Sequence, residues 1–110
     1  MDVIDIAIFS CEGEAPVSPP DTPTGLTSEN DGLGGLNIAW NSSADATYYE
    51  YQYNVDGGAY SAWTNNGAST SGYIGGLTNG TTVCVRVRAC NTGGCSFQSF
   101  AVCVVIGNPE

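Results

Sequence analysis

The stretch Thr82-Val83-Cys84-Val85-Arg86-Val87-Arg88-Ala89 decides the fold. Its side chains alternate strictly: one parity holds only valine and alanine, and the other holds a threonine, a cysteine and two arginines. Successive side chains of a β-strand point to opposite faces of its sheet, so this pattern predicts a strand with one face on a core and the other in water. We therefore expect residues 82–89 to be a strand of an all-β domain.

Six further short apolar or alternating runs surround this stretch: Gly25–Ser28, Leu36–Trp40, Tyr48–Val55, Ala59–Trp63, Ser69–Ile74 and Phe97–Val105. Between the third and fourth runs, Asp56-Gly57 is typical of a two-residue hairpin turn, because both residue types tolerate the positive φ that such turns require. The chain shows no apolar repeat at helical spacing, and its 15 glycines disfavour helices. Seven short strands at regular spacing predict two antiparallel sheets packed face to face.

Three segments carry a resemblance to the fibronectin type III domain: Pro20–Leu26 with Leu36–Trp40, Tyr49–Tyr53, and Leu77–Ser99. In that order, they resemble the family's first two strands, its aromatic third strand, and its sixth strand with the loop beyond it. The resemblance implies a seven-stranded antiparallel β-sandwich over residues 23–107, with Trp40 and the tyrosines in its core. Val83 departs from the pattern, since the family usually has a tyrosine there. The chain has no Arg-Gly-Asp tripeptide, so integrin binding is not implied.

Residues 1–22 differ in composition and are predicted to be an extended N-terminal arm and a proline-rich linker. Four of the five prolines lie within residues 16–23, as is typical of a stiff, extended segment. Seven acidic side chains and no basic one lie within residues 1–31. The arm also carries large apolar side chains, on a segment too short to bury them on itself: Val3, Ile4, Ile6, Ile8 and Phe9.

We expect this arm to add as an extra strand to an exposed sheet edge of a neighbouring subunit. Asp2 and Asp5 would keep the free arm soluble and could meet Arg86 or Arg88 of the neighbour, and Cys11 at its base could lock the joint. Two alternatives are open: the arm folds back as an extra strand on its own domain, or it is a linker.

Five cysteines in 110 residues favour disulfides in an oxidising compartment over a zinc site or free thiols. Four residues separate Cys90 from Cys95, which is a hairpin-loop length, so these two are predicted to bond. The register of that hairpin places Cys103 diagonally across from Cys84. A bulge or a slip in the last strand would join these two cysteines, and Cys11 is left over.

The composition excludes several classes of function. The chain has no His and no Lys, its formal net charge is −9, and few of its acids lie outside the N-terminal third. We therefore expect no enzyme and no catalytic residues, cofactor or metal. Two arginines offer too little charge to bind nucleic acid, and no apolar run is long enough for membrane insertion. Glu29–Asp31 lacks the ligand spacing of a calcium loop and is predicted to be a solvated turn.

Four residues of the predicted sandwich are candidates for contact with a partner: Tyr60, Trp63, Arg86 and Arg88. The two aromatic residues follow the Asp56–Gly58 turn and have little reason to be buried, and the two arginines are predicted to face outward. Aromatic residues and arginine contribute strongly to protein interfaces. The expected partner is a protein, either another copy or a neighbouring structural subunit, with a surface glycan as a second class.

Together these observations predict a non-catalytic structural or adhesive surface module. In the favoured setting it is a subunit of an extracellular or virion assembly (a filament, capsid decoration or tail component), attached through its arm and located outside the cell or on the virion surface. In the alternative it is an accessory binding module of a secreted multidomain protein, such as a carbohydrate-active enzyme or an adhesin.

Overall fold

The alternating stretch forms the longest strand, β6 (Thr82–Asn91), in the computed structural model, which describes residues 17–107. The four apolar side chains of its inner face are completely buried: Val83, Val85, Val87 and Ala89. The opposite parity lies on the outer face and is less buried at Cys84, Arg86 and Arg88. The core-facing and solvent-facing sides predicted from parity are thus both present in β6.

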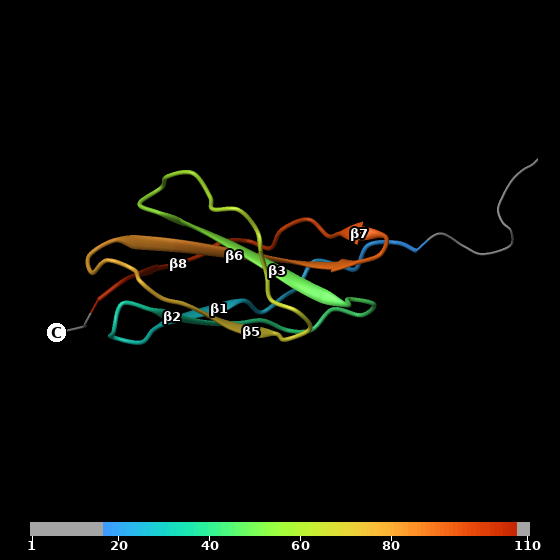
Figure 1. The fold of residues 1–110 in the computed structure, drawn as a ribbon, viewed down its shortest axis with the longest axis horizontal. Coiled ribbons are helices and arrows are strands. Elements are labelled where there is room, and N and C mark those ends of the chain that lie inside the picture. The colour runs from blue at the N-terminus through green and yellow to red at the C-terminus, as the bar shows by residue number, and fades with distance from the viewer. Residues whose placement is uncertain (1–16, 108–110) are drawn as a thin grey trace, which may run out of the picture.

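Within residues 17–107, eight strands form two antiparallel sheets that face each other (Figure 1). The first sheet has the order β1-β2-β5, and the second has the order β4-β3-β6-β7, with β8 also paired to β6. The other strand bounds are β1 (Thr27–Asn30), β2 (Leu36–Ala39), β3 (Tyr48–Val55), β4 (Thr64–Asn65), β5 (Ser71–Ile74), β7 (Gly94–Cys95) and β8 (Val102–Val105). The predicted all-β antiparallel sandwich is therefore confirmed, with eight strands rather than seven.

The core fills the space between the sheets. Leu36, Ile38 and Ile74 of the three-stranded sheet are buried with the inner face of β6 in one apolar cluster. Trp40 belongs to this cluster and packs edge-on against Tyr49, with ring centroids 5.8 Å apart. The prediction that Trp40 is a core residue rather than part of a binding surface is confirmed.

The prediction of a fourth strand at Ala59–Trp63 is wrong. β4 begins at Thr64 instead, in a segment predicted to be a turn. The Asp56-Gly57 turn has the expected positive φ values, 51° and 75°. Beyond it, Ser61 pairs with Tyr53 of β3 irregularly: the Ser61 N–H donates to the Tyr53 carbonyl, but the Tyr53 N–H donates to the Ser61 hydroxyl. The side chain thus takes the position of a backbone acceptor, and the regular ladder is interrupted.

The first, fifth and last predicted strands also have different bounds. β1 begins two residues later than expected, β5 is shorter, and β7 lies in the predicted Cys90–Ser96 loop. Of the predicted last strand, Phe97–Val105, only Val102–Val105 is regular.

The irregular part of that strand, residues 96–101, changes its register on β6. Cys90 pairs with Cys95, whereas Cys84 lies directly opposite Cys103, a shift of two residues relative to a regular continuation of the hairpin. The shift is the slip on which the Cys84–Cys103 pairing depended. Ser96 and Ser99 are three positions apart, but their partners Ala89 and Val87 on β6 are only two apart, so this interval contains one extra residue. The interval from Ser99 to Val102 contains a second extra residue, because Val102 pairs with Val85.

Serine side chains make this slip possible. The N–H groups of Ser96 and Ser99 donate to the carbonyls of Ala89 and Val87, at 2.7 and 2.8 Å. In return, the N–H groups of Ala89 and Val87 donate to the two serine hydroxyls, at 3.0 and 3.1 Å. We call these two pairings and that of Ser61 with Tyr53 the serine bridges, since each hydroxyl replaces a carbonyl.

The residues that follow Ser96 and Ser99 face solvent. Phe97 is 86% exposed and Phe100 is 95% exposed. The extra residue in each interval lets the chain bulge away from β6, and the large apolar side chain leaves the sheet with it.

The loop between β1 and β2 is organised by Asp31. Its Oδ1 accepts hydrogen bonds from the N–H groups of Leu33 and Gly35, and its Oδ2 accepts one from the Tyr73 hydroxyl at 2.7 Å. The hydrogen bond from Tyr73, with those from the backbone, holds the pKa of Asp31 below its usual value, and the same contact raises the pKa of Tyr73. The predicted solvated turn is thus an exposed loop whose carboxylate is bound by its own chain.

The serine bridges predict an unusual sensitivity to loss of one hydroxyl. Ser99→Ala leaves the Val87 N–H without its acceptor, so we expect the variant to lose about 1–3 kcal/mol of unfolding free energy. Urea unfolding under oxidising conditions measures this loss as a lower midpoint with an unchanged slope. Ser42→Ala, at an exposed position, is the control and should be neutral. Equal midpoints for the two variants would show that the bridge contributes nothing.

Loss of the Tyr73 hydroxyl should raise the pKa of Asp31 toward its ordinary value, as measured by NMR titration of the Tyr73→Phe variant. Because the folded pKa of Asp31 is lowered, its stabilising contribution is present above the unfolded pKa and disappears as pH falls through the folded pKa. The stability difference between wild type and Tyr73→Phe should therefore be present at neutral pH and vanish in acid. Tyr48→Phe is the control, since the structure shows no hydrogen bond of that hydroxyl within residues 17–107. An Asp31 pKa that does not move in Tyr73→Phe would contradict this assignment.

Candidate functional site

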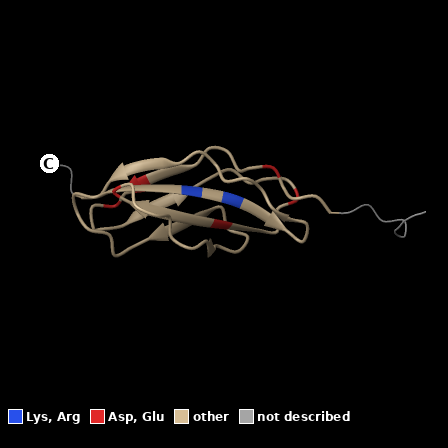
Figure 2. Cartoon of the chain, turned by 90° about the horizontal axis from the view of Figure 1, so that it is seen from above, with Lys and Arg blue, Asp and Glu red and all other residues tan. Residues whose placement is uncertain are grey.

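The outer face of the five-stranded sheet carries both arginines of the chain. The register of β3 on β6 places Glu50 opposite Arg88 and Gln52 opposite Arg86. Figure 2 shows the two arginine segments close together on one strand, in the middle of the domain. The positive charge of the chain is therefore concentrated at one place on the sandwich.

Arg88 is held between a carboxylate and an indole. Its Nε and Nη2 both donate to Glu50 Oε1, at 2.9 and 2.6 Å. Its guanidinium carbon lies 4.1 Å from the centroid of the Trp63 ring. The two side chains of the ion pair are only 28% and 16% exposed, so the pair is shielded from solvent more than an ordinary surface pair.

Arg86 makes an equivalent arrangement with neutral partners. Its Nε donates to Gln52 Oε1 at 2.6 Å, and its guanidinium carbon lies 3.7 Å from the centroid of the Tyr60 ring. Gln52 in turn donates to the Ser61 carbonyl at 2.8 Å. The loop after the Asp56-Gly57 turn is thereby fixed over the outer face, where it buries Gln52.

The structure brings all four predicted contact residues together. Tyr60, Trp63, Arg86 and Arg88, with Glu50 and Gln52, form a single group that we call the arginine–aromatic face. The sequence reasoning did not single out Glu50 and Gln52 as partners of the arginines. The available signal was their shared parity on β3, which becomes a pairing only once the register on β6 is known.

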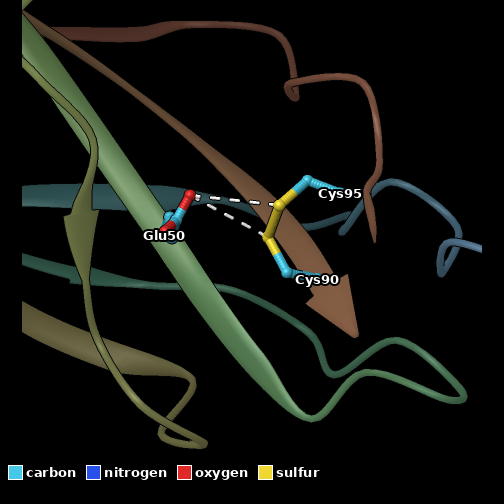
Figure 3. A group of neighbouring side chains, drawn as sticks. All are labelled: Glu50, Cys90 and Cys95. Atoms are coloured by element: carbon cyan, nitrogen blue, oxygen red, sulfur yellow. Dashed lines mark hydrogen bonds between the residues drawn. A yellow bond between two sulfur atoms is a disulfide. The ribbon is translucent and has the colours of Figure 1, made fainter. Parts of the chain in front are cut away.

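Two disulfides flank the arginines on the same face of β6. Cys90 bonds to Cys95, and Cys84 bonds to Cys103, in the pairings that loop length and register favoured. Figure 3 shows the Glu50 carboxylate directed at the first of these bonds, with Oε1 at 3.9 and 4.0 Å from its two sulfurs.

Glu50, Cys90 and Cys95 place three potential metal-ligating atoms within 4.8 Å of one another. Metal ions bind cysteine as the thiolate, however, and here the two sulfurs are bonded to each other. In the oxidised chain this group offers a single anionic ligand, so its chemistry does not fit a metal centre. What the outer face can do is present stacked cations, aromatic rings and hydrogen-bonding groups to a partner.

The predicted assembly residues fall outside the described part of the chain: Val3, Ile4, Ile6, Ile8, Phe9 and Cys11. Within residues 17–107, no helix is long and apolar enough to cross a membrane.

No protein-family model and no curated protein matches the sequence. Solved structures do match. The sixth fibronectin type III domain from human fibronectin type III domain containing protein 3 is 22% identical, with a TM-score of 0.72 over 89% of this chain and 95% of that one. An Fn3-like protein from Clostridium thermocellum is 26% identical, with a TM-score of 0.69 over 84% of this chain and 99% of that one.

A third similar structure is the twitchin kinase region from C. elegans, which is 23% identical with a TM-score of 0.69. The match covers 81% of this chain but 17% of that one. These likenesses establish that the chain has the fibronectin type III fold, as the residues of the sixth strand indicated.

The Glu50 carboxylate should protect the Cys90–Cys95 bond from reduction. Thiol–disulfide exchange begins with attack by a thiolate, which a neighbouring carboxylate repels. We expect Glu50→Gln to accelerate reduction of this bond by roughly two- to fivefold, because the variant removes the carboxylate and leaves the Arg88 guanidinium without its counter-charge.

The rate is measured by mass spectrometry after timed quenching, with the Cys84–Cys103 bond of the same molecule as internal reference. Glu29→Gln, on the other sheet, is the control. If both bonds accelerate equally in Glu50→Gln, the effect is general unfolding and the electrostatic explanation is wrong.

Proposed function

We propose that this domain is a non-catalytic structural or adhesive module of an extracellular or virion assembly, with the arginine–aromatic face as its contact surface for a neighbouring protein. The observation that carries the proposal is the stacking of Arg86 on Tyr60 and of Arg88 on Trp63. Arginine, tyrosine and tryptophan are the residue types that dominate interface hot spots. Their mutual packing holds these side chains in place before binding, which lowers the entropic cost of association.

A protein partner fits this face better than a glycan. Sugars bind aromatic residues by stacking on an open ring face, and here one face of each ring carries a guanidinium group. The guanidinium groups retain N–H donors directed away from Glu50 and Gln52. Acidic or carbonyl groups of a neighbouring protein are the natural acceptors for these donors.

The disulfides support an extracellular or virion location. Both lie within one face of the domain, and such bonds persist in oxidising surroundings rather than in a reducing cytosol.

The arm is the element proposed to attach the module to its assembly. Its apolar residues are separated from the sandwich by the prolines of residues 16–23, and an extended apolar segment next to a domain with open strand edges favours strand addition between chains.

A second candidate function has one specific observation in its favour. In the twitchin kinase region, the part similar to this chain is a small share of a much longer protein. By analogy, the domain would be one accessory binding module of a secreted multidomain protein, and the arm would be a linker. This setting requires no self-assembly.

Removal of residues 1–11 separates the two settings. If the arm attaches the module, the full chain should sediment as an assembly, and the truncated chain should sediment as a folded monomer. Circular dichroism provides the control for folding. A full chain that is monomeric at all concentrations favours the multidomain setting. A truncated chain that assembles as well as the full chain contradicts attachment through the arm.

The same samples test the contact face. Trp40 is buried, so quenching of tryptophan fluorescence by acrylamide reports mainly on Trp63. If the arginine–aromatic face contacts a neighbouring subunit, quenching should be weaker in the assembled full chain than in the truncated chain. Equal quenching in the two states would remove this face from the subunit contact.

A further inference from the structure

A groove runs along one side of the sandwich, where the two sheets leave an open seam. Its walls are residues 22–26, which precede β1, and residues 98–102, which precede and begin β8. The groove has a volume of about 820 Å³, and the exposed Phe100 lies on its wall.

Both walls of the groove are extensions of strands that pair with a neighbour on one side. Thr24 pairs with Asn41 on one side, and Ser99 pairs with Val87 on the other. Within residues 17–107, the structure shows no hydrogen bond from the N–H groups of Gln98, Phe100 and Ala101. An extended segment entering the seam would therefore find backbone donors as well as an apolar surface.

The bulged segment between the two disulfides is rigidly presented. The Cys90–Cys95 and Cys84–Cys103 bonds hold its ends to β6. The serine bridges of Ser96 and Ser99 hold its middle. Phe97 and Phe100 nevertheless extend into water. Covering two exposed phenyl groups on one fixed edge would release free energy, so this edge favours the binding of an apolar partner.

We propose that this groove receives the arm of a second copy of the chain, with residues 3–9 added as an extended strand. The inference rests on the proposed arm-mediated assembly and identifies the site at which the arm binds. In an extended strand, Ile4, Ile6 and Ile8 would share one face, which would pack into the seam and against Phe100. Seven extended residues span roughly 23–25 Å, enough to follow the wall formed by residues 98–102.

The charges of the two parts are compatible. The arm carries Asp2 and Asp5 and no basic residue. The residues lining the groove include none of the chain's eleven acidic residues but do include Arg86, one of its two cations. An acidic segment therefore meets no like charge there, whereas many other parts of this acidic chain would repel it.

The linker favours a second copy over the arm of the same chain. Pro19 and Pro20 each fix φ near −65° and keep the preceding residue extended. The Asn91 side chain donates to the Ser18 carbonyl, so the linker is tied to the end of β6. To enter its own groove, the arm would have to reverse direction directly before this stiff and anchored segment.

Complementation between two defective full-length chains tests the proposal by sedimentation. Ile6→Asp disables the arm but leaves the groove intact, and Phe100→Ser disables the groove but leaves the arm intact. Both are made in a Cys11→Ser background, so that chains exchange freely. Leu33→Ser removes a similarly exposed apolar side chain from the β1–β2 loop and is the matched control.

We expect each defective chain alone to be monomeric and the mixture to form a one-to-one complex, because the arm of the Phe100→Ser chain can still enter the groove of the Ile6→Asp chain. Phe100→Ser alone should weaken assembly by roughly tenfold or more, and Leu33→Ser should not change it.

Other outcomes overturn the proposal in distinguishable ways. If Ile6→Asp abolishes assembly and Phe100→Ser does not, the arm binds elsewhere: the groove assignment is wrong, but arm-mediated assembly stands. If the full chain is monomeric, both are wrong. A monomer in which Ile6→Asp shifts the amide resonance of Phe100 would show that the arm occupies its own groove.

Discussion

The strict alternation of side chains along β6 is the constraint on which the rest of the structure depends. The strand lies between β3 and the segments β7 and β8, so its two faces set the environment of the whole sheet. From Val83 to Ala89 its inner face is apolar and buried, and it faces the three-stranded sheet across the core. Because the period is two, the same ten residues must direct both arginines and the two disulfide cysteines, Cys84 and Cys90, to the opposite face. The core and the arginine–aromatic face are therefore produced by one pattern, and neither can shift without the other.

Much of this arrangement could be predicted from parity and turn chemistry. The inner face of β6 and the positive φ at Asp56 and Gly57 follow from local rules that need no knowledge of distant partners. The core position of Trp40 is implied by the family resemblance rather than by a local rule. The errors lie where a side chain substitutes for the backbone. Ser61, Ser96 and Ser99 are ordinary polar residues in the sequence, and only their position opposite a particular N–H group turns them into ladder acceptors. The same limit applies to the candidate site, since the partners of the arginines depend on the register of β3 on β6 and on the path of the loop above them.

The outer face also shows how an acidic chain accommodates its few cations. One arginine is neutralised by Glu50, and the other is bound by the uncharged Gln52, so the surface is not a simple basic patch. Stacking on aromatic rings removes part of each guanidinium from water and makes the interaction less dependent on salt than an open ion pair. A partner would therefore recognise shape and directed donors on this face more than net charge. The groove on the seam between the sheets shares Arg86 with this face but is otherwise an apolar edge without acidic groups, so the two surfaces are suited to different contacts.

The Cys84–Cys103 bond has a mechanical consequence. It joins two residues that are 19 apart in the sequence and whose Cα atoms are 4.0 Å apart. A force applied to the two chain ends is therefore carried by the disulfide, and the residues between Cys84 and Cys103 are not stretched. On unravelling, the domain would lengthen by roughly 60 Å less than an unbridged chain of the same size. The extensible portion is confined to the strands before β6, while the stapled edge with its two phenylalanines keeps its shape under load.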